Sequence, residues 1–225
     1  MTYIAAFILG YVIGAAPIIY FVARARGIDL HSVGTGNIGA GNLWRHSGMV
    51  IGMLSVIIEV GKGTLAALLA ANLLPGDDTQ WLLVAGGVGA VVGQMWPVTL
   101  RFQGGRGNGT AAGALVAIDP FAFVFGFGIF LLFGARKIIR NVLPKVASAP
   151  PSRIIPVAVI GGMSVYTIAA LALSENAAAI AGAVVLGLTF IRRATAPWPP
   201  DPETGEAPER SLFAILIYDR PNSGQ

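Results

Sequence analysis

The chain has 225 residues, 55% of them hydrophobic and only 12% charged, whereas about a quarter of a soluble domain is charged. With 30 glycines, this composition favours an integral membrane protein of closely packed helices. The net charge of +4 suits basic loops beside apolar segments, so nucleic acid is not expected as a partner. The lack of cysteine excludes disulfides and a thiolate nucleophile, and with histidine only at His31 and His46 no metal site is expected.

Apolar runs long enough to cross a bilayer make up most of the chain. A bilayer core about 30 Å thick needs roughly 20 residues of helix. Runs that approach or exceed this length are 3–23, 48–74, 81–100, 154–173 and 176–191. The apolar stretch 111–135 contains Asp119-Pro120, and the residue before a proline resists helical geometry. We therefore expect two short helices there.

The distribution of charge predicts the topology. If the N-terminus lies outside and the chain turns back at Asp119-Pro120, every basic residue except Lys62 falls on the cytoplasmic side. The charges in the outer turns are then all acidic, namely Asp77, Asp78, Asp119 and Glu175. A single span over 111–135 would instead put the basic loop 136–153 outside.

These features predict an all-α, polytopic membrane protein with about seven transmembrane helices. We expect its N-terminus outside and its functional loops on the cytoplasmic side. Residues 1–191 are expected to form one helical bundle, and residues 192–225 a cytoplasmic Pro-rich tail.

Two glycine-rich loops on the predicted cytoplasmic face are candidate anion sites. The first, SVGTGNIGAGNLWR at 32–45, ends in Arg45, and the second, RFQGGRGNGT at 101–110, contains Arg106 and leads into a helix. Glycine lets backbone N–H groups turn toward an anion, and arginine offers a bidentate fork to phosphate. A flexible connector is the competing interpretation of each loop.

The third candidate is Glu59 with Lys62, within the predicted second span. A charge inside a membrane is costly and is functional by default. Residues three apart share a helix face, so the two side chains can also form a self-neutralising structural pair. Gln94, Trp96 and Pro97 end the third span beside the second loop.

These segments resemble the acyl-phosphate-dependent glycerol-3-phosphate acyltransferases of the PlsY type. Members read GSGNxGxTNxxR in the first loop, where this chain has GTGNIGAGNLWR at 34–45. They carry an acid three residues before Lys-Gly in the next helix, matched here by Glu59 and Lys62-Gly63. They end the following span with GHxFPxxxxFxGGKG, against GQMWPVTLRFQGGRG at 93–107. The similarity covers residues 10–120, with the same helix plan afterwards.

The resemblance implies transfer of a fatty acyl group from acyl phosphate to the 1-hydroxyl of glycerol 3-phosphate at the cytoplasmic face of a bacterial plasma membrane. Partners would be these two substrates and membrane lipid, without a cofactor, and the oligomeric state stays open. The catalytic candidates are Thr35, Arg45, Lys62 and Arg106, supported by Glu59 and Gln94. Candidates for substrate binding are Gly34, Gly36, Asn37, Gly39, Asn42, Gly104, Gly105 and Gly107.

Departures from the family pattern leave two alternatives. The chain has Thr35, Gly41, Gln94 and Arg106 where the family has Ser, Thr, His and Lys. The family's C-terminal His and Asn are missing, and FIRRATAPW or ILIYDRPNS occupies that region. One alternative is therefore an inactive member, or one that acts on another phosphorylated acceptor. The other is a small-anion transporter, which would also use basic loops and an intramembrane Glu-Lys pair.

Overall fold

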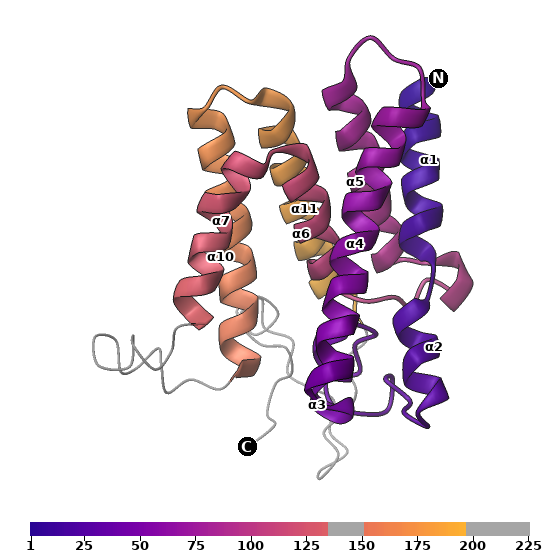
Figure 1. Cartoon of the computed structure of the whole chain (residues 1–225). Coiled ribbons are helices and arrows are strands. Elements are labelled where there is room, and N and C mark those ends of the chain that lie inside the picture. The colour runs from indigo at the N-terminus through magenta and orange to yellow at the C-terminus, as the bar shows by residue number, and fades with distance from the viewer. Residues whose placement is uncertain (135–150, 197–225) are drawn as a thin grey trace.

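The computed structural model describes residues 1–134 and 151–196, and within these ranges the chain is helical with connecting loops and no strand (Figure 1). The elements are α1 (Thr2–Ala15), α2 (Ile18–Ala25), α3 (Ala40–Ser47), α4 (Met49–Leu73), α5 (Thr79–Met95), the 3₁₀ turn η1 (Val98–Leu100), α6 (Asn108–Ile118), α7 (Pro120–Gly134), α10 (Pro151–Ala172) and α11 (Asn176–Thr195).

The ends of the bundle differ in charge. The N-terminus and the turns that join α4 to α5, α6 to α7 and α10 to α11 lie toward one end (Figure 1). These turns contain the acidic residues predicted for them, Asp77, Asp78, Asp119 and Glu175. The short helices α2 and α3 lie toward the other end, and among the described residues Arg24 and Arg45 lie in the last turns of these helices. This separation of charge along the bundle is the one predicted from the sequence.

The helices are apolar, and many of their large apolar side chains are exposed on the surface of the bundle. Four helical segments, 2–25, 49–73, 79–100 and 176–195, are long and apolar enough to cross a membrane, and α6, α7 and 156–172 are shorter apolar helices. Large apolar side chains such as Phe21, Ile57 and Phe121 are 61–70% exposed, as expected of surfaces that face hydrocarbon. The chain is therefore a multi-pass membrane protein.

Small residues allow the helices to approach closely. Gly10 and Gly14 of α1 lie against the backbone of Gly86 and Ala90 of α5, where an added methyl group would collide with their carbonyl oxygens. Association of helices in lipid depends on such van der Waals contact, because burial of apolar surface provides little driving force there. The close packing of α1 against α5 thus fixes the positions of these two helices relative to each other.

The expected span 3–23 lies within the helical segment 2–25, which is long enough to cross a membrane and is interrupted at Ala16-Pro17 between α1 and α2. Ala16 is extended (φ −63°, ψ 115°), as favoured for a residue before proline. The break frees carbonyl groups that must find partners inside the protein. Lys62 Nζ donates to Ala16 O (2.8 Å), and Thr99 Oγ1 donates to Ala15 O (2.8 Å).

Two further boundaries differ from the sequence-based expectations. The loop predicted for 32–45 ends in helix α3, whose Gly39 N-cap is extended, so Asn42 and Arg45 are helical. Helix α11 continues one turn past the predicted end at residue 191 and includes Arg192 and Arg193. The stretch 111–135 divides at Asp119 into α6 and α7, as expected. The Pro-rich tail beyond residue 196, and residues 136–150 of the basic loop, lie outside the described residues.

Candidate active site

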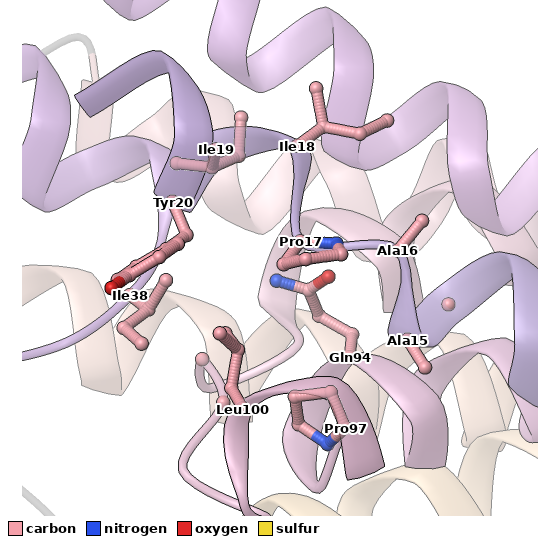
Figure 2. A pocket seen from close by; sticks show the side chains of 13 residues that line it. Ala15, Ala16, Pro17, Ile18, Ile19, Tyr20, Ile38, Gln94, Pro97 and Leu100 are labelled. Carbon is pink, nitrogen blue, oxygen red and sulfur yellow. The ribbon is translucent and has the colours of Figure 1, made fainter. Parts of the chain in front are cut away.

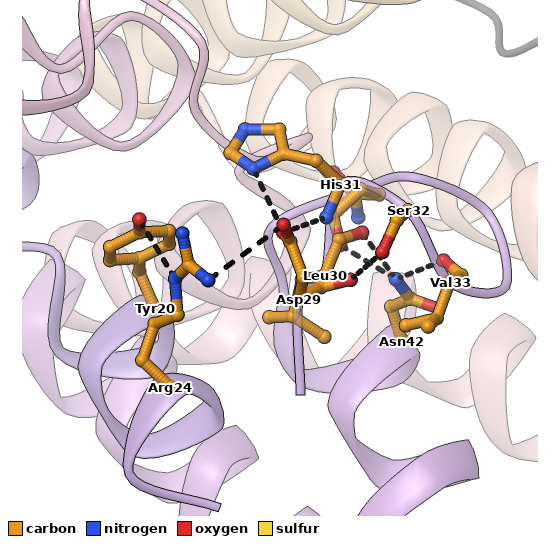
Figure 3. Close-up of polar contacts among 9 residues, drawn as sticks. Tyr20, Arg24, Asp29, Leu30, His31, Ser32, Val33 and Asn42 are labelled. Atoms are coloured by element: carbon orange, nitrogen blue, oxygen red, sulfur yellow. Dashed lines mark hydrogen bonds and ion pairs between the residues drawn. The ribbon is translucent and has the colours of Figure 1, made fainter. Parts of the chain in front are cut away.

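Asn42 organises the first glycine-rich loop from its position in α3. Its Nδ2 donates to the carbonyls of Leu30 (3.1 Å), Val33 (3.0 Å) and Asn37 (3.1 Å), and its Oδ1 accepts from Thr35 N (3.2 Å). Figure 3 shows the amide enclosed by the loop. Because Asn42 is only 2% exposed, these bonds also satisfy a buried polar group. Asn42 is therefore the organising centre of the loop, a role that differs from the substrate binding predicted for it.

Glycine is required at position 34 of this loop. Gly34 has a φ of +55°, a conformation that residues with a side chain rarely adopt. A Cβ there would also collide with Asn42 Oδ1 and lie 2.7 Å from His46 Cε1. The loop therefore curls tightly around the Asn42 amide.

A second group of polar side chains fixes the start of the loop. Arg24 Nε donates to Tyr20 Oη (3.1 Å), and an Arg24 nitrogen lies 3.9 Å from a carboxylate oxygen of Asp29 (Figure 3). The other carboxylate oxygen accepts from His31 N (3.1 Å). Exposed ion pairs of this kind add little stability, but they orient the chain that leads into the loop. Tyr20, Asp29 and His31 were not among the predicted site residues.

Glu59, Gln94 and Lys62 form a buried hydrogen-bonded chain between α4 and α5. Lys62 Nζ donates to Gln94 Oε1 as well as to Ala16 O, and Gln94 Nε2 donates to Glu59 Oε1 (3.3 Å). Glu59 Oε1 also accepts from Ala40 N (3.1 Å) at the start of α3. Each of the three side chains is 7% exposed. A carboxylate at a helix N-terminus is electrostatically favourable, so Glu59 anchors α3 while Lys62 anchors the α1–α2 break.

The second glycine-rich loop lies between α5 and α11. Gly105 N donates to Gln94 O (3.0 Å). On the other side, Arg192 Nε donates to Gly105 O (3.0 Å) and Arg192 Nη2 to Gly104 O (2.6 Å). The Arg192 guanidinium also lies 5.9 Å from the ring centroid of Trp96. Sequence reasoning treated Arg192 only as a topology signal, and its contacts with the loop depend on the tertiary fold.

A pocket between the two loops brings several predicted residues together. It encloses about 330 Å³, including space open to solvent. Its lining residues are His31, Thr35, Gly36, Asn37, Gln103, Gly104, Arg106, Arg192 and Ala196. Both arginines face it, and none of the described residues that line it is acidic. The pocket is therefore cationic and suited to an anion. Within residues 1–134 and 151–196, no cluster of three or more His, Asp or Glu side chains could hold a metal ion.

Other predicted site residues lie outside this pocket. Arg45 is exposed in the last turn of α3 and does not line it. Lys62 lines neither this pocket nor the one described next. Gly39 and Gly107 also do not line the pocket. Gly39 lies next to the Asn37 amide, and Gly107 lies against Met95. Of the two arginine candidates in the glycine-rich loops, Arg106 therefore lines this pocket and Arg45 does not.

A more apolar pocket lies on the other side of the second loop, at the α1–α2 break. Figure 2 shows the Gln94 amide beside Pro17 and Ala16, with Leu100 and Ile38 opposite. Gly104 lines both pockets and Gly105 lines this one. The Gly104-Gly105 backbone thus separates a cationic pocket from an apolar one.

These features define the class of the protein as a polytopic helical membrane protein with a cationic pocket between two glycine-rich loops. The sequence model of a family described as glycerol-3-phosphate acyltransferase matches residues 4–195. The chain belongs to this family.

Individual relatives agree with this assignment. The chain is 42% identical over 126 residues to a glycerol-3-phosphate acyltransferase of Rubrobacter xylanophilus, covering 56% of this chain and 60% of the relative. It is 35% identical over 145 residues to glycerol-3-phosphate acyltransferase 5 of Dehalococcoides mccartyi, covering 64% of this chain and 61% of the relative. The chain thus aligns with about three fifths of the length of these relatives.

Two crystal structures share the fold. Both are of PlsY (YgiH), an integral membrane glycerol 3-phosphate acyltransferase, one in a glycerol 3-phosphate form and one in a lysophosphatidic acid form. The first has a TM-score of 0.67 at 27% identity and the second 0.68 at 25%. Each comparison covers 86% of this chain and 88% of the other.

Proposed function

We propose that this chain transfers a fatty acyl group from acyl phosphate to the 1-hydroxyl of glycerol 3-phosphate, giving lysophosphatidic acid and inorganic phosphate. The observation that carries the proposal is the pocket lined by Arg106 and Arg192 without an acidic residue among the described lining. Two guanidinium groups in one pocket repel each other, and a phosphate between them removes that repulsion. The PlsY structures in glycerol 3-phosphate and lysophosphatidic acid forms are consistent with this substrate and product.

The reaction needs charge stabilisation more than a protein nucleophile. The 1-oxygen of glycerol 3-phosphate forms a bond to the acyl carbonyl carbon, and the bond from that carbon to the phosphate oxygen breaks. Phosphate leaves with the bonding electron pair, and it is itself a base for the proton that the hydroxyl loses. Donors that face the developing charge lower the barrier, and fixed loops hold the two reactants in line.

Each candidate residue has a role in this proposal. The Thr35 hydroxyl and Asn37 amide, which line the pocket with Arg106, contact phosphate or acyl oxygens directly. Arg45, exposed in α3, adds positive charge beside the first loop. Lys62 acts through its bonds to Ala16 O and Gln94 and holds the chain break beside the site. Lys62 is thus a positioning residue in this proposal.

We further propose seven membrane crossings, an outside N-terminus and an active face in the cytoplasm of a bacterium. Support comes from the acidic turns at one end of the bundle and the described arginines of α2 and α3 at the other. A cysteine introduced at Ser148, in the basic loop 136–153, should then resist an impermeant thiol reagent in intact cells. Ready labelling there would contradict this topology.

The activity is tested directly with purified protein and radiolabelled acyl phosphate. With glycerol 3-phosphate as acceptor we expect labelled lysophosphatidic acid, and with glycerol, which lacks the phosphate, we expect little product. Efficient transfer to a different phosphorylated alcohol would reassign the acceptor. No acyl transfer, together with phosphate uptake into proteoliposomes, would favour the transporter instead.

A further inference from the structure

Arg192 joins the last turn of α11 to the second glycine-rich loop. It is 5% exposed, and its guanidinium donates to the carbonyls of two consecutive residues, Gly104 and Gly105. Trp96, at the end of α5, lies under the same guanidinium at cation–π distance. A charged side chain buried at this level is expected to be paired, and here its partners are backbone dipoles of the loop.

The loop depends on this contact because Gly104 and Gly105 have no side chains of their own. Their backbone is packed too tightly for one, since a Cβ at Gly104 would collide with Gln94 O and Pro97 Cδ, and one at Gly105 would lie 2.5 Å from Ile38 O. The α5 side of the loop is fixed by the bond from Gly105 N to Gln94 O. Arg192 fixes the opposite side through the two carbonyls.

We propose that Arg192 is a positioning residue for phosphate, an inference that rests on the proposed function. By donating to both carbonyl oxygens, its guanidinium keeps these negative ends away from the anion and sets the position of the following residue, Arg106. Arg192 also lines the cationic pocket, so its charge reinforces that of Arg106. The affinity for phosphate should therefore depend on the forked geometry of Arg192 as well as on its charge.

Lysine cannot reproduce this geometry. Two of the five donors of the planar guanidinium reach adjacent carbonyls while its central carbon lies over the Trp96 ring, whereas an ammonium group is a point charge without a fork. Arg192→Lys keeps the net charge and thus separates geometry from charge. Arg101→Lys is the matched control, because Arg101 belongs to the same loop region but is exposed and lines neither pocket described above.

The experiment combines kinetics with a binding measurement that does not require turnover. Loss of hydrogen bonds that involve a charged group should raise the KM for glycerol 3-phosphate or acyl phosphate on the order of tenfold in Arg192→Lys, with a smaller change in kcat. The inorganic phosphate concentration that gives half-maximal thermal stabilisation should rise by a similar factor. Arg101→Lys should match the wild type in both measurements.

A second variant keeps the inference testable if Arg192→Lys does not fold. Trp96→Phe replaces the indole under the guanidinium with a smaller ring that is a weaker cation–π partner but leaves both carbonyl bonds, so KM and the phosphate midpoint should rise only a few-fold. Unchanged values in both variants, or a lower melting temperature with an unchanged KM, would make Arg192 a purely structural residue. A wild type that phosphate does not stabilise would also overturn the inference.

The two proposals can fail separately. If the wild type shows no acyl transfer but phosphate binding weakens in Arg192→Lys, the role of Arg192 stands and the reaction must be revised. If transfer is normal and Arg192→Lys binds phosphate and substrates like the wild type, the proposed function stands and Arg192 has no positioning role.

Discussion

The two glycine-rich loops are held in different ways. The first is organised from within its own segment, by the Asn42 amide, which bonds backbone atoms of residues only five to twelve positions away. The second is held by Arg192, which is 87 and 88 positions away along the chain, and by the end of α5. A local motif can thus specify the first loop, whereas the shape of the second depends on the assembled bundle.

The largest effect is expected from breaking the first loop at its centre. Asn42→Asp keeps the size of the side chain but removes the donors, so a carboxylate oxygen would face three carbonyl oxygens. We expect acyl transfer to fall on the order of 100-fold, because the loop loses its geometry. The measurement is kcat/KM together with thermal stability. Asn72→Asp, at an exposed asparagine in α4, is the control and should behave like the wild type.

The next largest effect is expected from substitutions in the buried hydrogen-bonded chain of Glu59, Gln94 and Lys62. Lys62→Met leaves Glu59 buried without its cation and should cost about 3–5 kcal/mol of stability. The double variant Glu59→Met with Lys62→Met should be more stable than Lys62→Met alone, because no uncompensated charge remains. Thermal unfolding of the three proteins checks this order.

Acyl transfer in the same double variant tests the role of Lys62. Residual activity would support its assignment as a positioning residue. A well-folded double variant with no activity, partly restored when Lys62→Arg replaces Lys62→Met, would return Lys62 to the phosphate site.

Two glycines of the first loop region should respond differently to replacement by alanine. Gly34→Ala should destabilise the protein by roughly 1–2 kcal/mol from backbone strain, with an added cost from the collision with Asn42. Gly41→Ala, in helix α3 with no heavy atom within 4 Å of the added methyl group, should be neutral or stabilise by up to about 1 kcal/mol. Opposite changes in thermal stability would confirm that, of these two glycines, Gly34 is the one that is conformationally required. Equal effects would contradict that conclusion.

The smallest effect is expected at Arg45. Because it is exposed and does not line the cationic pocket, Arg45→Lys should change KM by no more than a few-fold and leave stability unchanged. If the charge of Arg45 attracts the substrates, Arg45→Ala should raise KM more than Arg45→Lys does, and this increase should become smaller as the salt concentration rises. An unchanged KM in Arg45→Ala at low salt would remove this residue from the candidate site.

The sequence by itself predicted the membrane class, the helical fold, the division of 111–135 at Asp119 and the two glycine-rich loops. These features depend on composition, on runs of apolar residues and on local backbone preferences, all of which act over short distances along the chain. The break at Ala16-Pro17 was missed although proline signals it, because the apolar run continues through it without a polar residue.

The assembled fold alone decided how the site is put together. It placed Lys62 on Ala16 O and Gln94, two residues that line the apolar pocket, although Lys62 itself lines neither pocket, and it placed Arg192 on the second loop. In a low-dielectric interior each buried carbonyl and charge must find a partner, and which partner is near depends on helices that are distant in sequence. The position of a basic residue next to an apolar run therefore predicts the side of the membrane on which that residue lies. Its hydrogen-bond partners are decided by the packed bundle.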